Sequence, residues 1–250
     1  MTHLNIISQN PESTLVSEFK RDDKRERSYQ SEAALEAAFI RQLQEQGYEY
    51  LPIVDEKSLI ANLRSQLERL NDFKFSDSEW DLFFKMVLAN QNDGIVEKTN
   101  TIQNDSVKVL SLLDGGKDGV NFRNIKLIDK DDIHRNSLQV INQYVVEDGA
   151  RSNRYDVTIL VNGLPLVHVE LKKRGVDLKE AFNQINRYQR DSFWAGSGLF
   201  EYVQLFVISN GTFTRYYSNT TRNAHVKKTN ELKARNSTKS TGSFEFTSYW

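Results

Sequence analysis

The sequence predicts an α/β fold in which helices flank a mixed β-sheet. Two apolar runs of strand length, Val157–Val161 and Leu166–Leu171, stand on either side of Asn162-Gly163, a pair typical of a hairpin turn. Residues 178–191 follow with apolar side chains at helical spacing. A second Asn-Gly pair, at 210–211, joins two further strand-like runs. Together these three observations place strand pairs and a helix in one layered core.

An added helical segment is expected before the sheet. Leu35, Phe39 and Leu43 form an apolar stripe, and the run from Ser76 to Glu79 has the residues of a capping box. On the later helix the predicted sheet-facing residues are Leu178, Ala181, Phe182 and Ile185. The expected helices are residues 28–46, 59–70, 79–89 and 178–191.

The expected strands come from β-branched and aromatic runs bounded by turn residues. Three precede the central hairpin and two follow the long helix. They cover residues 107–113, 125–128, 138–146, the two arms of the hairpin, 202–209 and 212–217.

Composition narrows the class of protein. The chain has 250 residues, a net charge of −1, 38% hydrophobic residues and no cysteine. A disulfide framework and a thiolate zinc site are therefore excluded. No apolar run reaches the roughly 18 residues that cross a bilayer, and no signal peptide opens the chain, so a cytoplasmic protein without a membrane contact is expected.

The hairpin carries the strongest functional signal. Because side chains on a strand alternate faces, His168, Glu170 and Lys172 share one face of an otherwise apolar strand. A three-residue loop of residues 162–164, or an equivalent bulge, puts Asp156 directly opposite Glu170; a two-residue loop alone pairs Asp156 with Val169 instead. Directly opposite residues share a face, so we expect the two carboxylates to meet.

Two carboxylates that meet repel each other unless a cation lies between them. Mg²⁺ suits such a site, since it accepts one or two carboxylates together with waters. A metal ion bound by Asp156 and Glu170 would activate water and neutralise phosphodiester charge, and Lys172 would assist the attacking water. The predicted reaction is metal-assisted phosphodiester hydrolysis.

The same residues resemble a known superfamily. Asp156 and Glu170-x-Lys172 on adjacent strands, followed by a helix, are similar to the PD-(D/E)xK nucleases, although Tyr155 stands where the motif has proline. Gln184 and Tyr188 match the QxxxY motif of the RecB-like branch. The stretches 31–50 and 136–149 resemble the amino-terminal region of the R (restriction and motor) subunit of type I restriction–modification enzymes, and the whole resemblance spans roughly residues 28–217.

The resemblance implies an endonuclease domain that cuts double-stranded DNA with Mg²⁺ and without sequence preference of its own. It implies methyltransferase (M) and specificity (S) partner subunits. It also implies a helicase-like motor in the same polypeptide, to which any ATP requirement would belong. This chain contains no G-x-x-x-x-G-K-[ST] phosphate-binding motif.

Several further residues are candidates, each with a plainer alternative. Glu32 is expected to take a metal or supporting role, whereas Glu36 is interpreted as a solvent-side acid near a helix amino terminus. Gln184 and Tyr188 are expected to position DNA or water rather than merely to pack on the sheet. His168 could act as an auxiliary base or contact phosphate, or could be a hydrogen-bonded structural histidine. The basic candidates for DNA contact are Lys173 and Arg187, for which a solvated surface is the alternative.

The predicted domain organisation has three parts. Residues 1–27 form a polar amino-terminal arm, residues 28–219 the endonuclease domain with a catalytic core at about 105–217, and residues 220–250 a linker toward an absent motor domain. Two other functions stay open at this point: a non-catalytic module of the same fold that guides DNA or docks subunits, and a stand-alone PD-(D/E)xK repair nuclease.

Overall fold

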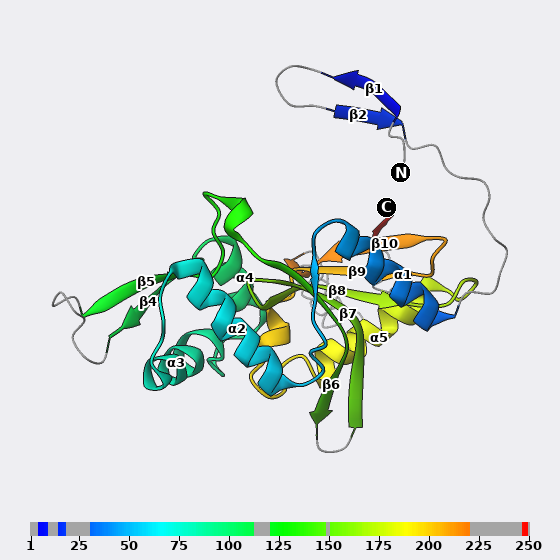
Figure 1. Cartoon of the computed structure of the whole chain (residues 1–250). Helices are drawn as coiled ribbons and strands as arrows, with labels where there is room; N and C mark the ends of the chain where they lie inside the picture. Colours follow the sequence, from blue (N-terminus) through cyan, green and yellow to red (C-terminus); the bar gives the residue numbers. More distant parts are fainter. Residues whose placement is uncertain are drawn as a thin grey trace, which may run out of the picture.

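A seven-stranded mixed sheet forms the centre of the molecule (Figure 1). The computed structural model describes residues 5–9, 15–18, 31–112, 121–148, 151–220 and 247–249. Within them the strand order is β11-β10-β9-β8-β7-β6-β3, with β3 parallel to β6, β8 parallel to β9, and the other neighbours antiparallel. The predicted α/β class with a mixed sheet is confirmed. The strands are β3 (Glu49–Tyr50), β6 (Leu138–Asp148), β7 (Arg151–Val161), β8 (Leu164–Leu171), β9 (Leu205–Ser209), β10 (Thr214–Ser218) and β11 (Ser248–Tyr249).

Helices cover both faces of this sheet. On one face, α1 (Glu32–Glu45) buries Ile40 and Leu43 against Val140, Val157, Val169 and Leu171. The other face carries a larger core built from the remaining helices and the hairpin. These helices are α2 (Glu56–Asn71), α3 (Asp77–Phe83), α4 (Ile95–Gln103) and α5 (Leu178–Asp191), with 3-10 turns η2 (Ile133–Arg135) and η3 (Leu199–Tyr202).

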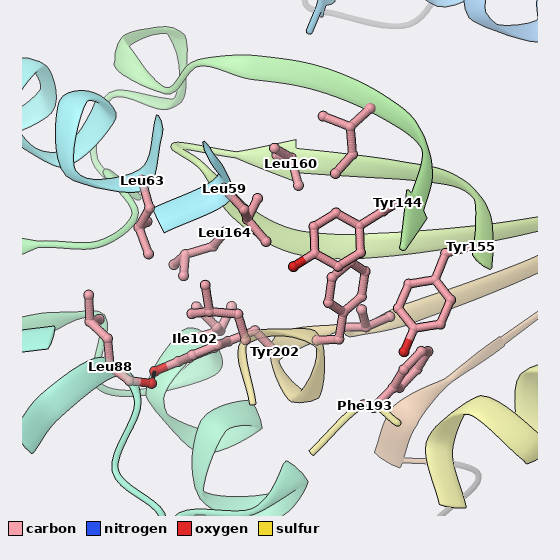
Figure 2. Close-up of a cluster of buried hydrophobic side chains, with 14 of the residues drawn as sticks. Leu59, Leu63, Leu88, Ile102, Tyr144, Tyr155, Leu160, Leu164, Phe193 and Tyr202 are labelled. Carbon is pink, nitrogen blue, oxygen red and sulfur yellow. Dashed lines mark hydrogen bonds between the residues drawn. The ribbon is translucent and has the colours of Figure 1, made fainter. Parts of the chain in front are cut away.

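The larger core joins the added helical segment to the hairpin. Figure 2 shows Leu59 and Leu63 of α2 lying beside Leu160 and Leu164, and all four side chains are fully buried. Deleting one buried leucine side chain of this kind typically costs about 2–5 kcal/mol. The four predicted sheet-facing residues of α5 all belong to this core. The helices before the sheet are therefore part of one folding unit with it.

The hairpin turn is buried and held in place by other segments. Asn162 and Gly163 have φ angles of 51° and 82°, the left-handed pair that a two-residue type I′ turn requires. The Asn162 side chain accepts from the N–H of Ser137 at 2.8 Å and donates to the carbonyl of Leu127 at 3.0 Å. A Cβ on Gly163 would lie 2.6 Å from the Cα of Leu63, so α2 packs directly on the turn.

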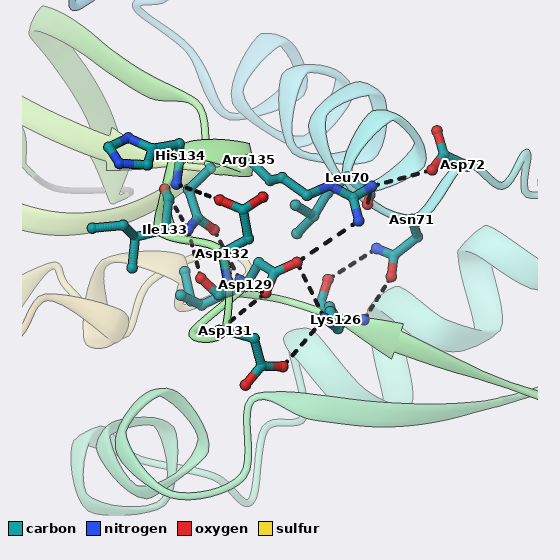
Figure 3. A network of polar contacts seen from close by, with 12 residues as sticks. Leu70, Asn71, Asp72, Lys126, Asp129, Asp131, Asp132, Ile133, His134 and Arg135 are labelled. Carbon is teal, nitrogen blue, oxygen red and sulfur yellow. Dashed lines mark hydrogen bonds and ion pairs between the residues drawn. The ribbon is translucent and has the colours of Figure 1, made fainter.

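A polar network fixes the connection between β5 (Phe122–Lys126) and β6 to the end of α2 (Figure 3). The carboxylate of Asp129 accepts from the N–H groups of Asp131 and Asp132 and from Lys126 Nζ. Arg135 donates to the carbonyl of Leu70 and to Asp72, both at 3.1 Å. These bonds anchor the chain just before the strand that enters the central sheet.

Some expected elements differ from those observed. The first helix begins at Glu32, because Ser31 is the N-cap and accepts from the N–H of Ala34. The expected helix 79–89 is α3 followed by a π-helical turn, Phe84–Leu88, and α4 and β3 were not predicted. The strand expected at 125–128 is β5, which pairs with β4 (Val107–Ser111) in a separate two-stranded sheet. The expected strand 202–209 starts at Leu205 because η3 precedes it, and the expected strand 212–217 is β10.

Short strands lie in both terminal segments. Strands β1 (Asn5–Gln9) and β2 (Leu15–Glu18) pair antiparallel within the predicted polar amino-terminal arm. Most of the expected linker lies outside the described residues, but β11 pairs with β10. No helix in the described part of the chain is long and apolar enough to cross a membrane.

Candidate active site

A bulge brings the two predicted acids opposite each other. Val157 pairs with Val169, and extending this register by one residue sets Asp156 across from Glu170. The turn has two residues, so the predicted three-residue loop is wrong. Its stated equivalent, a bulge, is confirmed: Ile159 pairs with Val167 and Leu160 with Pro165, which leaves Leu166 as the extra residue.

Burial dominates the electrostatics of the acid pair. Glu170 is fully buried and Asp156 is partly buried. Burial raises the pKa of Asp156 to about 7, and the nearby charge of Glu170 adds to this rise. Burial likewise raises the pKa of Glu170 to about 7 against the opposing influence of Lys172. Two carboxyl groups with raised pKa values in one place form a site that favours a cation.

Lys172 and the backbone orient the pair. Lys172 Nζ donates to Glu170 Oε1 at 3.0 Å, and the N–H of Leu171 donates to Asp156 Oδ2 at 2.9 Å. Burial works to lower the pKa of Lys172, but the charges of Glu170 and Asp156 outweigh it and leave the pKa raised. The lysine therefore stays cationic beside the two acids. The structure brings together all three residues that the sequence predicted as catalytic.

The amino-terminal part of α1 adds two more acids, Glu32 and Glu36, and a metal or supporting role for Glu32 stays a prediction. Glu36 was interpreted as a solvent-side acid, which is wrong: it is buried and accepts hydrogen bonds from Asn142 and Gln143. Burial raises its pKa, and the nearby charge of Asp156 adds to this rise. Glu32 is exposed, and its Oε1 accepts from the N–H of Lys173 at 3.2 Å.

The amide partners of Glu36 were missed by the sequence analysis. Asn142 and Gln143 lie on β6, and Gln143 has φ 54°, an uncommon conformation for a non-glycine residue. Their bonds to Glu36 join positions 106 and 107 residues apart. No local sequence pattern indicates a contact between residues so far apart in the chain.

On the other face of the site, α5 supplies the QxxxY residues. Tyr188 is buried, and its hydroxyl donates to the carbonyl of Arg154 at 2.7 Å and accepts from Gln184. Burial and the charges of Glu170 and Asp156 raise the pKa of Tyr188 to about 12. These contacts tie α5 to β7 beside Asp156. A role for Gln184 and Tyr188 in positioning DNA stays a prediction.

The remaining candidates divide by exposure. Lys173 and Arg187 are exposed, the guanidinium of Arg187 lies 5.4 Å from the ring centre of Tyr188, and a phosphate contact by either residue stays a prediction. His168 is fully buried, with Tyr155, Tyr188 and Phe193 edge-on to its ring, and a phosphate contact stays a prediction. Burial lowers the pKa of His168 to about 4, with the charge of Asp156 opposing, so the ring is neutral near pH 7. Its Nε2 lies 3.5 Å from Glu170 Oε2.

The donor set fits a hard cation. Among the described residues no group of three His, Cys, Asp or Glu side chains converges as a ready metal cage. Two carboxylates, however, match the habit of Mg²⁺, which keeps several waters and takes one or two protein carboxylates with substrate phosphate oxygens. Asp156 and Glu170 are the residues that would hold it.

Comparison with known proteins assigns the family. Residues 29–225 match the family described as "Type I restriction enzyme R protein N terminus". The chain belongs to this family. It is 48% identical over 217 residues to the type I restriction enzyme EcoprrI endonuclease subunit of Escherichia coli, covering 86% of this chain and 67% of that protein.

Relatives in the R protein family differ widely in length. The type I restriction enzyme SauCOLORF180P endonuclease subunit of Staphylococcus aureus (strain COL) is 41% identical over 193 residues, which are 77% of this chain but 20% of that protein. A putative type I restriction enzyme MjaIXP endonuclease subunit of Methanocaldococcus jannaschii is 35% identical over 103 residues, 39% of this chain and 10% of that protein. The chain thus spans a fifth of the staphylococcal protein.

Proposed function

We propose that this chain is the endonuclease domain of a type I restriction enzyme R subunit, and that it hydrolyses phosphodiester bonds of double-stranded DNA with Mg²⁺. The observation that carries the proposal is the acid pair Asp156–Glu170 with the Nζ of Lys172 3.0 Å from Glu170. The relatives from Escherichia coli and Staphylococcus aureus are named as endonuclease subunits, which supports the nuclease activity. The fold and the order of the motifs support membership of the PD-(D/E)xK superfamily.

Asp156 and Glu170 would bind the ion, and Lys172 would stabilise the negative charge that develops on the phosphate. A bound Mg²⁺ would supply Lewis-acid stabilisation of the phosphodiester and a more acidic water. Asp156 and Glu170 hold their carboxylates in one place because the N–H of Leu171 and the Nζ of Lys172 each bind one of them. Lys172 keeps its proton and adds a positive charge where negative charge develops on the phosphate. Glu36 adds a further acid beside Asp156.

DNA binding is proposed to be weak and indifferent to sequence. The net charge of the chain is −1, so phosphate contacts must come from local groups such as Lys173 and Arg187. Specificity and delivery of the DNA would come from the methyltransferase and specificity subunits of a cytoplasmic restriction complex. ATP-dependent translocation would come from a motor in the additional length that the staphylococcal relative has.

The test combines metal binding by this chain with cleavage by the assembled enzyme. Isothermal titration of Mn²⁺ or Mg²⁺ into the chain should give a signal that Asp156→Ala and Glu170→Ala abolish. In the complete R subunit with its partners, Lys172→Ala should stop plasmid cleavage while ATP hydrolysis continues. Lys85→Ala is the matched control, because Lys85 is 73% exposed and makes only a 3.9 Å ion pair with Asp81.

Persistence of cleavage in Lys172→Ala at normal ATP turnover would refute the catalytic assignment. Loss of subunit assembly in the same variants, with cleavage intact in whatever assembles, would instead support the non-catalytic docking module. A nuclease that cuts without partners or ATP would point to the stand-alone repair enzyme.

A further inference from the structure

His168 is a buried polar residue that lies beside a carboxylate oxygen of Glu170. It lies on β8 two residues before Glu170, on the same face of the strand, and is fully buried. Within the described part of the chain neither ring nitrogen has a hydrogen-bond partner, and Glu170 Oε2 has none either. The Nε2 of His168 and the Oε2 of Glu170 lie 3.5 Å apart.

The ring is held rigidly by aromatic neighbours. Tyr155, Tyr188 and Phe193 each meet it edge-on, with ring centroids 5.5, 6.0 and 5.8 Å away. Three such contacts fix the plane of the imidazole and exclude water from it. Among these three aromatic rings, an imidazole without a hydrogen bond would lower the stability of the fold by about 1–3 kcal/mol relative to a hydrogen-bonded one. If His168 served only to pack, a leucine would therefore be more stable at this position.

The Oε2 of Glu170 is an acceptor that the imidazole of His168 could bind. A neutral imidazole carries one N–H donor and one acceptor nitrogen. Glu170 Oε1 is already bound by Lys172 Nζ at 3.0 Å, so a second donor at Oε2 would fix the rotation of the carboxyl group. Across the strand pair, Thr158 faces His168 and has a buried hydroxyl without a partner in the described residues, a polar neighbour for the ring.

We propose that His168 is a positioning residue whose Nε2–H donates to Glu170 Oε2 and presents the carboxylate to the divalent cation. This inference rests on the proposed function, since it assumes that Glu170 binds the ion. Hydrogen bonds to a ligating carboxylate orient it, and their loss typically lowers metal affinity about 10–100-fold. His168 itself touches neither DNA nor metal.

The first arm of the test examines the contact without metal. In the chain labelled with ¹⁵N-histidine, NMR should show His168 as the neutral Nε2–H tautomer with a slowly exchanging ring proton. That proton signal should move when Glu170 is changed to Gln and stay in place in Lys85→Ala. An Nδ1–H tautomer, or a signal that ignores Glu170→Gln, overturns the proposal.

The second arm measures metal affinity by calorimetry with Mn²⁺ on the same chain. His168→Leu occupies the space between the aromatic rings but has no hydrogen-bond donor, and it should weaken Mn²⁺ binding about 10–100-fold. His168→Gln keeps an N–H of similar reach and should bind Mn²⁺ within a few-fold of the parent chain. Equal affinity in the leucine variant, or no recovery in the glutamine variant, overturns the role. Circular dichroism of both variants confirms that they fold.

The two hypotheses fail in different ways. If Glu170→Gln abolishes Mn²⁺ binding and His168→Leu leaves it intact, the proposed function stands and the positioning role falls. If Glu170→Gln binds Mn²⁺ as well as the parent chain, the metal site and the positioning role fall together.

Discussion

Neutralising Asp156 should stabilise the metal-free chain at alkaline pH. Its pKa rises from an ordinary 3.8 to about 7 on folding, chiefly through burial. The folded chain therefore binds a proton more tightly than the unfolded chain does. The resulting stability is fully present below about pH 4 and is lost as the pH rises through about 7. Asp156→Asn has no charge to bury and escapes this loss.

The magnitude follows from the shift. About three pKa units at 1.36 kcal/mol each give an upper value of roughly 4 kcal/mol. Solvent access to this partly buried carboxyl reduces the expected gain to on the order of 2 kcal/mol. The asparagine oxygen can still accept the N–H of Leu171, so the bond at 2.9 Å need not be lost. The charge that opposes ionisation of Glu170 also disappears.

The assay is urea unfolding in EDTA at a series of pH values from 4.5 to 8.5. Asp156→Asn should exceed the parent in unfolding free energy at pH 8 and match it at the acid end. Asp81→Asn is the control, because it removes one carboxylate that is 70% exposed on α3. A variant that is less stable at pH 8, or a gain that does not vary with pH, would show that burial does not penalise this carboxylate.

Two further predictions concern stability. Gly163→Ala should cost at least about 2 kcal/mol in unfolding free energy, because its Cβ would lie 2.6 Å from the Cα of Leu63 at φ +82°. Gly175→Ala is the control: its φ is +91° and nothing lies within 4 Å of the added Cβ, so it should lose only the backbone part, about 1 kcal/mol. Equal losses in the two variants would refute the contact with Leu63. Lys98→Met should cost about 3 kcal/mol by calorimetry, because the buried Nζ donates to the carbonyl of Gly198 and to Glu201, both at 2.9 Å. Adding Glu201→Gln should recover part of that loss, and a double variant worse than the sum of the singles would contradict the pairing.

The sequence was sufficient for the central hairpin, most strands of the sheet, the helices α1, α2 and α5, and the acid pair. Alternation placed Glu170 and Lys172 on one face, and the parity of the hairpin required one extra residue between Asp156 and Glu170. It could not decide where that residue goes, since a longer loop and a bulge satisfy the same parity. Pro165 was the unused signal: it lacks an N–H for the ladder, and the bulge lies beside it.

Local sequence patterns did not reveal contacts between distant residues or very short strands. Glu36 was interpreted as a surface acid because it lies near a helix amino terminus, yet its environment is set by Asn142 and Gln143 on β6. The burial of His168 likewise comes from α5 and the loop after it, through Tyr188 and Phe193. Strand β3 has two residues, too few for any periodicity to reveal it.

The clamped hairpin turn has a consequence for the distant acids. Asp156 lies six residues from Asn162, roughly 20 Å along an extended strand. With Leu63 pressed against Gly163, the hairpin cannot slide by a residue to relieve the repulsion between Asp156 and Glu170. The packing of α2 on the turn therefore prevents slippage of the two hairpin strands. Loss of this packing would separate the carboxylates of Asp156 and Glu170 before the rest of the molecule unfolds.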